Sequence, residues 1–463
     1  MEMLFWRQGL LLKKCIFSPE LSIADKTYIM SQVKKLLVTT SWDDGSKEDL
    51  KLAELLNKYE IPATFYISSD KLLGDKGVRA LSREFEIGGH GLAHKDLSKV
   101  SLKIAEKEIS KNKCELENIT GKSVRSFAYP LGKFNSDLKQ MVGFCGFEYA
   151  RTTSLFELFI GDKVTGGTTV HAYNHNPLLF FKEGFNKRLF FKLITNSKFS
   201  LDWEQLAILA FEEARKTGGI YHLWGHSWEI EKYDGWQKLS RVLSYMRNNT
   251  QLSQRKTNIE TLGFFRAKKK LYYDKQYKKP RDKMVSGYVQ KLISGFDKKG
   301  FRILDIGCGD GYVSGLFKEA DYLGVDSSES AIRLAKKNFA AENRRFVVSQ
   351  LSNLKRLSSL KFDLILLLGT LEDEPNIPQI FGGLRSFIRE GTRLIITLHD
   401  TENIVFRIQE YVRREFGLRP FPFASYSMDF IEKELPLSLR PKERFRSFKV
   451  WGFGKEIFVV SDF

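Results

Sequence analysis

The sequence predicts two α/β domains in succession. A strand–helix–strand pattern fills residues 36–68, and a second pattern of strand, glycine turn and helix begins at residue 301. Strand–helix–strand units build parallel sheets and barrels. The chain has 463 residues, more than one ordinary domain, and 42% of them are apolar, enough for substantial cores. We expect domains at residues 34–255 and 283–463, joined by a basic linker at 256–282.

The predicted first domain begins with an apolar strand at Leu36–Ser41. Apolar residues at helical spacing predict a helix over Glu48–Tyr59, which ends before Pro62, and Ala63–Ile67 resumes as a strand. The remaining elements expected in this domain are strands at Phe85–Ile87, Ser126–Tyr129 and Ile220–Leu223 and a helix at Ser101–Asn118.

The predicted second domain starts with a strand at Phe301–Ile306. A glycine turn at Gly307–Gly311 and a helix follow, and the next strand, Tyr322–Val325, ends at Asp326. Further apolar strands are expected at Phe362–Leu368 and Arg393–Leu398. This alternation is typical of a doubly wound α/β sheet.

Positive charge is concentrated between the two predicted domains. The formal net charge is +18, and residues 251–300 alone contain 14 Lys and Arg against 4 Asp and Glu. We favour a solvated linker and helix face. The alternative is an anion-attracting patch for phosphate-bearing substrates or for peripheral contact with a membrane. No nucleic-acid recognition motif accompanies the charge, so a nucleic-acid partner is not expected.

The sequence favours a cytoplasmic protein. Its apolar runs are shorter than the roughly 18 residues that a membrane span needs. Arg7 interrupts the apolar N-terminal stretch, and no small-residue cleavage site follows it, so an export signal is not expected. Paired spacing is absent among the cysteines, which indicates reduced thiols; they are Cys15, Cys114, Cys145 and Cys308.

Carboxylates and imidazoles follow predicted strands of the first domain. Asp43 and Asp44 follow one strand, and His90 and His94 follow another. One carboxylate and two imidazoles are a ligand set for a catalytic divalent metal. A second carboxylate can take a proton from the metal-activated water, and His226, after the strand at Ile220–Leu223, can supply the acid that hydrolysis needs.

Two of these segments carry a family resemblance. Residues 41–45 (SWDDG) and 90–94 (HGLAH) resemble the first two motifs of the polysaccharide deacetylase family, whose fold is an irregular (β/α) barrel. The resemblance implies that Asp43 is the general base. It also implies that Asp44, His90 and His94 bind the metal, expected to be zinc. Gly91 replaces the hydroxyl residue that usually orients this loop.

Two further segments extend the resemblance. Residues 127–132 (FAYPLG) resemble the third motif, which implies that the backbone amide of Leu131 stabilises the oxyanion. Ala128 stands where the family often has an arginine that steers the base, so the steering must come from elsewhere or be weaker. Residues 219–229 resemble the last motif, which makes His226 the expected general acid and His222 the second choice.

Some residues of the first domain stay open to more than one interpretation. Asp202 and Trp203 either form a pocket wall of the family or start an ordinary helix with Asp202 as its N-cap. His171 and His175 match no motif. They line the substrate cleft, form a second metal site or are satisfied polar groups.

The glycine turn of the second domain indicates a nucleotide-like cofactor. Residues 304–311 (LDIGCGDG) follow a strand, and a carboxylate at the end of the next strand can accept hydrogen bonds from ribose. This pattern resembles class I S-adenosylmethionine-dependent methyltransferases, which have a Rossmann-like fold. The predicted cofactor-binding residues are Asp305, Gly307, Gly309, Gly311 and Asp326.

Two positions of the second domain are less defined. Many relatives place an aspartate near residues 349–351 to contact adenine, and here Ser349 or Gln350 would have to serve. His399, after the strand at Arg393–Leu398, is either a base for an acceptor hydroxyl or a structural residue.

Together these observations predict a bifunctional carbohydrate-tailoring enzyme. It would remove an N- or O-acetyl group from a sugar with a metal and transfer a methyl group from S-adenosylmethionine. A nucleotide-linked or lipid-linked glycan is the expected substrate. The alternatives are an amidohydrolase acting on a non-sugar amide, and a non-catalytic glycan-binding module attached to a methyltransferase.

Overall fold

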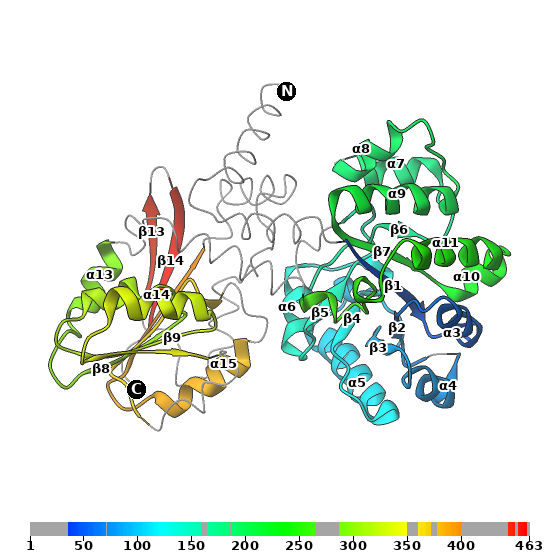
Figure 1. Ribbon diagram of the computed structural model, residues 1–463. Helices are drawn as coiled ribbons and strands as arrows, with labels where there is room; N and C mark the ends of the chain where they lie inside the picture. Colours follow the sequence, from blue (N-terminus) through cyan, green and yellow to red (C-terminus); the bar gives the residue numbers. More distant parts are fainter. Residues whose placement is uncertain are drawn as a thin grey trace.

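The computed structural model confirms two α/β domains (Figure 1). It describes residues 36–70, 72–158, 164–185, 187–263, 287–349, 360–371, 377–399, 443–449 and 452–460. Each domain is built on its own seven-stranded sheet. Each sheet also has a separate hydrophobic core, as expected for units of this size.

The sheet of the N-terminal domain is parallel and curled, as an irregular (β/α) barrel requires. Its order is β5-β4-β3-β2-β1-β7-β6. The two edge strands of this sheet are β5 and β6. The segment before β6 connects them, because Gly166 bridges Arg151 at the end of β5, while His171 of β6 pairs with Trp224 of β7. The strands are β1 Leu36–Asp44, β2 Ala63–Ile67, β3 Glu86–Gly89, β4 Ser126–Ala128, β5 Tyr149–Arg151, β6 Val170–His171 and β7 Gly219–Gly225.

Helices cover the outside of this curled sheet (Figure 1). They are α3 Asp49–Lys58, α4 Gly74–Leu81, α5 Leu102–Thr120, α6 Ser136–Phe144, α7 Pro177–Gly184, α8 Arg188–Ile194, α9 Trp203–Thr217, α10 Ser227–Lys232 and α11 Trp236–Asn248, with short 3₁₀ turns at Leu97–Lys99, Pro130–Gly132 and Leu252–Gln254. Asp202 caps α9 by accepting hydrogen bonds from two backbone amides of its first turn, which supports the helix-start interpretation of this residue.

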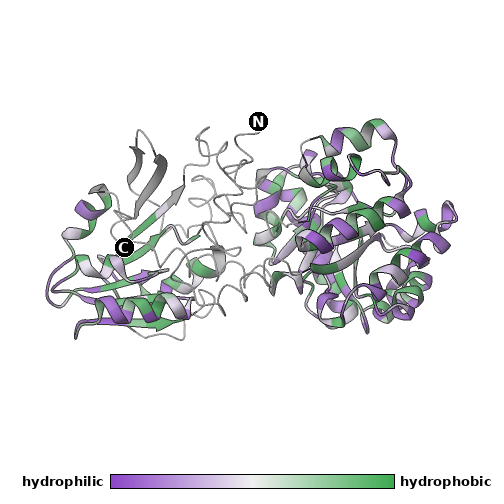
Figure 2. Cartoon of the chain, turned by 45° about the horizontal axis from the view of Figure 1, so that its top comes forward, coloured by the Kyte–Doolittle hydropathy of each residue, from purple (hydrophilic) through white to green (hydrophobic). Residues whose placement is uncertain are grey.

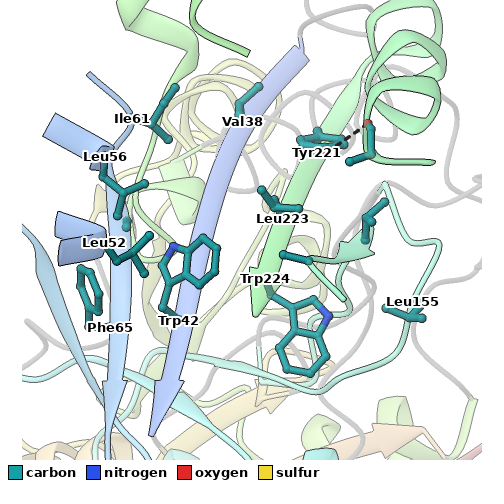
Figure 3. Packing of buried hydrophobic residues seen from close by; sticks show 14 of the residues in the cluster. Val38, Trp42, Leu52, Leu56, Ile61, Phe65, Leu155, Tyr221, Leu223 and Trp224 are labelled. Carbon is teal, nitrogen blue, oxygen red and sulfur yellow. Dashed lines mark hydrogen bonds between the residues drawn. The ribbon is translucent and has the colours of Figure 1, made fainter. Parts of the chain in front are cut away.

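The core of the N-terminal domain fixes the strands that carry the site. Trp42 of β1 packs beside Leu52 of α3 and Phe65 of β2 (Figure 3), and all three side chains are fully buried. On the neighbouring strand, the Tyr221 hydroxyl donates a hydrogen bond to the Ala207 carbonyl of α9. Truncating a buried leucine such as Leu52 to alanine costs about 2–5 kcal/mol in comparable cores.

The C-terminal domain is Rossmann-like and doubly wound. Its sheet order is β10-β9-β8-β11-β12-β14-β13. The first five strands of this order are parallel, and β14 runs antiparallel to β12 and β13. The strands are β8 Arg302–Ile306, β9 Asp321–Asp326, β10 Arg344–Val348, β11 Leu364–Leu368, β12 Arg393–His399, β13 Glu443–Lys449 and β14 Gly452–Val460; the helices are α13 Gly287–Ser294, α14 Glu329–Phe339 and α15 Ile377–Leu384.

Several expected elements differ in extent from the observed ones. The first strand continues to Asp44, so Asp43 and Asp44 form its carboxyl end instead of a following loop. The helix expected after the glycine turn is only a 3₁₀ segment, Tyr312–Leu316. Within the described part of the chain, no helix is long and apolar enough to cross a membrane.

The predicted domain limits stay a prediction, but the structure describes contacts close to one of them. The Lys256 amide donates a hydrogen bond of 2.9 Å to the Val38 carbonyl of β1. Asn258, which is fully buried, bonds to Thr39. The N-terminal domain therefore includes these residues. The lysines that dominate the predicted basic linker, from Lys268 to Lys279, lie outside the described residues.

Candidate active sites

Asp44, His90 and His94 come together at the carboxyl ends of β1 and β3. Asp44 is the last residue of β1, and His90 follows β3 directly. The Oδ1 atom of Asp44 lies 3.6 Å from Nε2 of His90 and 3.4 Å from Nε2 of His94. One donor atom from each residue lies within 4.8 Å of the others. The three predicted metal ligands therefore share one site.

The donor atoms fit a divalent metal. Asp44 Oδ1 is buried and has no hydrogen-bond partner among the residues that the structure describes, which is costly unless a cation takes that place. The other oxygen, Oδ2, accepts a hydrogen bond of 2.9 Å from the Trp228 indole. His90 Nδ1 is 2.8 Å from the Ala128 carbonyl. That carbonyl can only accept, so Nδ1 carries the proton and Nε2 presents its lone pair toward Asp44.

A buried glutamate holds the loop between the two histidines. Glu108 of α5 accepts hydrogen bonds from the amides of Leu92, at 3.0 Å, and Ala93, at 3.1 Å. Gly91 has φ +78°, a conformation that other residues adopt at a cost. The missing hydroxyl at residue 91 is thus compensated by a carboxylate from a neighbouring helix.

Three residues at this site have left-handed backbone conformations. The φ angles are 80° for Asp44, 45° for His94 and 59° for Leu131. Such angles cost of order 1–3 kcal/mol for residues other than glycine, and they gather at functional sites. Within the described part of the chain, the Leu131 amide donates no backbone hydrogen bond. It is therefore available to an oxyanion, as the resemblance implies.

Arg151, which the sequence did not reveal, holds the predicted general base. Its side chain is fully buried and contacts Oδ1 of Asp43, while its Nε donates to Ser41 Oγ at 3.1 Å. The guanidinium lies between the rings of Tyr66 and Trp224, 5.0 and 4.9 Å from their centroids. Asp43 Oδ2, the other oxygen of the carboxylate, lies 4.0 Å from His90 Nε2.

His226 lies at the metal-ligand group and is part of a histidine–glutamate chain. Its Nε2 is 3.8 Å from Asp44 Oδ2, and its Nδ1 is 2.6 Å from Glu229 Oε2. The same glutamate oxygen is 3.0 Å from His171 Nε2, and His171 Nδ1 is 2.9 Å from His175 Nε2. His171 stacks on Trp224 at 3.9 Å. The histidine pair His171 and His175, which matched no motif, thus belongs to this site.

Charge and burial fix the tautomers of this chain. Burial alone would raise the pKa of Glu229, but hydrogen bonds from His171 and His226 outweigh it and lower the pKa to about 2. Because an ionised carboxylate only accepts, both histidines donate to it. Burial lowers the pKa of His171 to about 4, so this ring is neutral and its Nδ1 accepts from His175. The Nδ1 atom of His226 is occupied by Glu229, so its Nε2 atom is the one that can exchange a proton with a substrate.

His222, the second choice for the general acid, lies apart from the predicted metal ligands. His222 is buried on β7, and its Nε2 is 2.8 Å from Ser41 Oγ, beside Arg151 instead of the metal ligands. Among the candidates for the acid, only His226 approaches Asp44. The donor atoms of His171, His226 and Glu229 also lie close enough together to hold an ion, so the second-metal interpretation remains open beside that of a hydrogen-bonded chain.

The glycine turn of the C-terminal domain lies where the strand order reverses, between β8 and β11. Asp326, at the end of β9, accepts hydrogen bonds from the amides of Gly309, at 2.9 Å, and Ser328, at 2.8 Å. At Gly307 a Cβ would collide with Thr370. Beside the turn, a Cβ on Gly369 would meet no described atom within 4 Å. Ligands of doubly wound sheets bind at this reversal point, so the turn and the space fit a nucleotide-like cofactor.

The structure describes some of the remaining predicted residues of the C-terminal domain and not others. The Asp305 carboxyl is buried and accepts a hydrogen bond from the Tyr322 hydroxyl, and burial raises its pKa to about 7. The predicted cofactor-binding residue Asp305 is thus bonded to the neighbouring strand β9. Gly311 has φ +82° and ends the turn. Ser349 donates its amide to the Asp326 carbonyl, whereas Gln350 and the side chain of His399 lie outside the described residues.

Comparison with known proteins identifies both domains. Residues 31–150 match the family model of the polysaccharide deacetylases, and residues 297–418 match that of a methyltransferase domain. The chain therefore joins a polysaccharide deacetylase domain to a methyltransferase domain, and S-adenosylmethionine is the methyl donor that the second domain implies. The two domain types are those of a hydrolase and a transferase. A search of curated proteins gave no match.

Solved structures that match parts of this chain are distant in sequence. A polysaccharide deacetylase structure from Mycobacterium smegmatis is 16% identical, covering 46% of this chain and 85% of its own, with a TM-score of 0.36. A family 4 carbohydrate esterase from Streptomyces lividans is 15% identical, covering 46% and 89%, with a TM-score of 0.31. The plantazolicin methyltransferase BamL is 17% identical, covering 38% and 82%, with a TM-score of 0.30.

Proposed function

We propose that the N-terminal domain is a metal-dependent hydrolase that removes an acetyl group from an acetylated sugar, and that the C-terminal domain methylates a glycan precursor. The observation that carries the first activity is the buried, unpartnered Oδ1 atom of Asp44, which faces Nε2 of His90 and of His94. A carboxylate and two imidazoles with open positions are typical of a catalytic zinc site.

Each residue at the site has a separate role in the proposed hydrolysis. Asp44, His90 and His94 would hold zinc or a similar ion, which supplies a water of lowered pKa and polarises the acetyl carbonyl. Asp43, held by Arg151, takes the proton of the attacking water. The Leu131 amide donates a hydrogen bond to the developing oxyanion.

The leaving group needs a proton, and His226 is placed to give it. Glu229 accepts the Nδ1 proton of His226 and so directs Nε2 to the side of Asp44. Burial opposes a charged imidazole, but the hydrogen bond to Glu229 and the charges of Asp43 and Asp44 outweigh it and raise the pKa of His226. A histidine that is protonated near neutral pH is a suitable general acid.

Acetate release tests this function. The full chain would be assayed with zinc on acetylated nucleotide-linked sugars, acetylated lipid-linked sugars and non-sugar amides. We expect release from a sugar, and loss of at least about a hundredfold in kcat for Asp43→Asn with zinc still bound. Glu115→Gln, an exposed change on α5, is the matched control. Release only from non-sugar amides would favour an amidohydrolase. No release from any substrate would favour a binding module.

The methyltransferase half is proposed to act on the same class of substrate. Mass spectrometry of candidate sugars would detect the gain of a methyl group when S-adenosylmethionine is added. A role for His399 as the base of the acceptor hydroxyl stays part of this proposal. If methylation appears only on a molecule without a sugar, the shared-substrate proposal is wrong while the methyl transfer itself stands.

A further inference from the structure

An amphipathic pair of helices is inserted next to the hydrolase site. Helices α7 and α8 lie between β6 and α9, at the top of the N-terminal domain in Figure 1. The ends of this insertion are held together, because the Trp203 amide donates to Asn174 Oδ1 at 2.8 Å. The insertion begins immediately after His175, whose ring contacts His171 of the site. Its base is therefore at the rim of the hydrolase site.

The inner face of the pair belongs to the core. Phe180, Leu189, Phe190 and Leu193 are buried, and the Phe180 and Phe190 rings pack on Phe156 at 4.8 and 5.1 Å. These residues account for the stability of the insertion, so the outer face is not needed to complete the core.

The outer face is unusually apolar for a water-exposed surface. Leu178 is 81% exposed, Phe185 69%, and Phe181 and Phe191 45% each. Leu178, Phe181 and Phe185 follow a spacing of three and four residues, which places them on one side of α7. The Phe185 and Phe191 rings are 6.3 Å apart, so the two helices share this surface. We call these four residues the outer apolar face.

The segment that carries the outer apolar face is rich in basic residues, of which Lys187 and Lys192 pair with Glu157 and Glu213. Residues 177–199 contain five Lys and Arg and one acidic residue, Glu183. Lys182 is exposed between Phe181 and Glu183 and forms no ion pair among the described residues. In Figure 2 the helices at the top of this domain carry both hydrophobic and hydrophilic residues. Exposed aromatic residues beside lysines are typical of helices that lie on anionic lipid surfaces.

We propose that the outer apolar face docks onto an anionic lipid bilayer. Phe181, Phe185 and Leu178 would enter the boundary between headgroups and acyl chains, and Lys182 would bind lipid phosphates. A second copy of the chain fits less well, because a two-fold contact would bring the same positive charges together. Single exposed leucines elsewhere, such as Leu252, carry no such inference.

Docking would also define the substrate class. A face at the rim of the hydrolase site would bring that site to sugars whose lipid carrier is embedded in the same bilayer. This second step rests on the proposed hydrolase function, whereas bilayer docking does not.

Co-sedimentation with vesicles tests the docking itself. The full chain would be mixed with vesicles of phosphatidylcholine alone and of phosphatidylcholine with phosphatidylglycerol. We expect binding to the anionic vesicles that weakens with salt. The double variant Leu178→Ser/Phe185→Ser should bind them at least about tenfold more weakly, because two apolar side chains no longer enter the bilayer. The matched control is Leu252→Ser/Phe144→Ser, with side chains 71% and 40% exposed away from this face.

The outcomes separate the alternatives. Equal weakening by both double variants, or binding that ignores phosphatidylglycerol, would overturn the proposal. Self-association of the wild type that is lost in Leu178→Ser/Phe185→Ser would assign the face to a second copy. Acetate release from a water-soluble sugar should be unchanged in that variant and reduced only for a vesicle-bound lipid-linked sugar. If no substrate is hydrolysed, the vesicle result still decides docking.

Discussion

Arg151 holds Asp43, the proposed general base, in a chain that has alanine where the polysaccharide deacetylases often have an arginine. Residue 128 is alanine, and its carbonyl orients His90 instead. The guanidinium reaches Asp43 from the next strand, β5, and is enclosed by Tyr66 and Trp224. The carboxylate of Asp43 is thus held by a residue at the end of β5 and not by one at position 128.

Replacing Arg151 should impair turnover more than substrate binding. In Arg151→Met the buried Asp43 loses its charged partner and its orientation, so kcat should fall by about tenfold to hundredfold with little change in KM. Arg151→Lys should recover part of the loss. The control is Arg125→Met, which removes an exposed ion pair with Glu148 on the adjoining strand. Unchanged kcat in Arg151→Met would remove it from the mechanism.

At the residue scale, the sequence predicted the three metal ligands but not the residues that hold the site in place. Asp44, His90 and His94 have recognisable spacing and follow apolar strands. Arg151, by contrast, ends a strand of only three residues, and nothing local marks it as buried. Glu108 has the appearance of an ordinary residue on a helix. Such supports depend on which strands and helices are neighbours, and that information exists only in the fold.

Two helices of the N-terminal domain are joined by a buried carboxyl. Asp49 of α3 accepts a hydrogen bond of 2.5 Å from Ser227 at the start of α10, and Ser227 is 2.6 Å from Ser46. Burial raises the pKa of Asp49 to about 8. The group therefore keeps its proton in the folded domain over a pH range in which the unfolded chain ionises.

The stability of the Asp49→Asn variant relative to the wild type should increase as the pH rises. Between about pH 4 and pH 8 the native state holds a proton that the unfolded state has released, so wild-type stability falls with pH. Asparagine has no such proton. The Tm of Asp49→Asn minus that of the wild type should increase from pH 5 to pH 8, equivalent to about 1–3 kcal/mol. Glu115→Gln, at an exposed position of α5, should give a constant difference. The opposite slope would contradict a protonated Asp49.

At the element scale, most strands with an apolar run were predictable, including the three-residue β4, whereas β10 and the shortest strands β5 and β6 were not. The expected bounds of β2 are those observed, and β1, β7, β8 and β9 were placed within a few residues. β5, β6 and the inserted helices α7 and α8 were not anticipated. Strands of two or three residues are too short for a hydrophobic period to appear. Their position is set by pairing with β4 and β7, which lie elsewhere in the sequence.

At the scale of the whole chain, two domain types with separate cores share one polypeptide. The methyl donor should bind at the reversal of strand order in the second sheet, and Asp326 should hold its ribose. Asp326→Ala removes that acceptor and releases the Gly309 amide, so S-adenosylmethionine should bind about ten- to hundredfold more weakly by calorimetry. Asp321→Ala, at the exposed start of the same strand, is the control. Equal affinities would place the donor elsewhere.

Zinc titration of the metal-free chain, followed by an assay of acetate release, would decide whether Asp44, His90 and His94 hold a catalytic metal. We expect one tightly bound zinc ion per chain to restore activity, and we expect Asp44→Ala neither to bind this ion nor to regain activity. A metal-free chain that releases acetate at the full rate, or an Asp44→Ala variant that binds zinc as tightly as the wild type, would contradict this expectation.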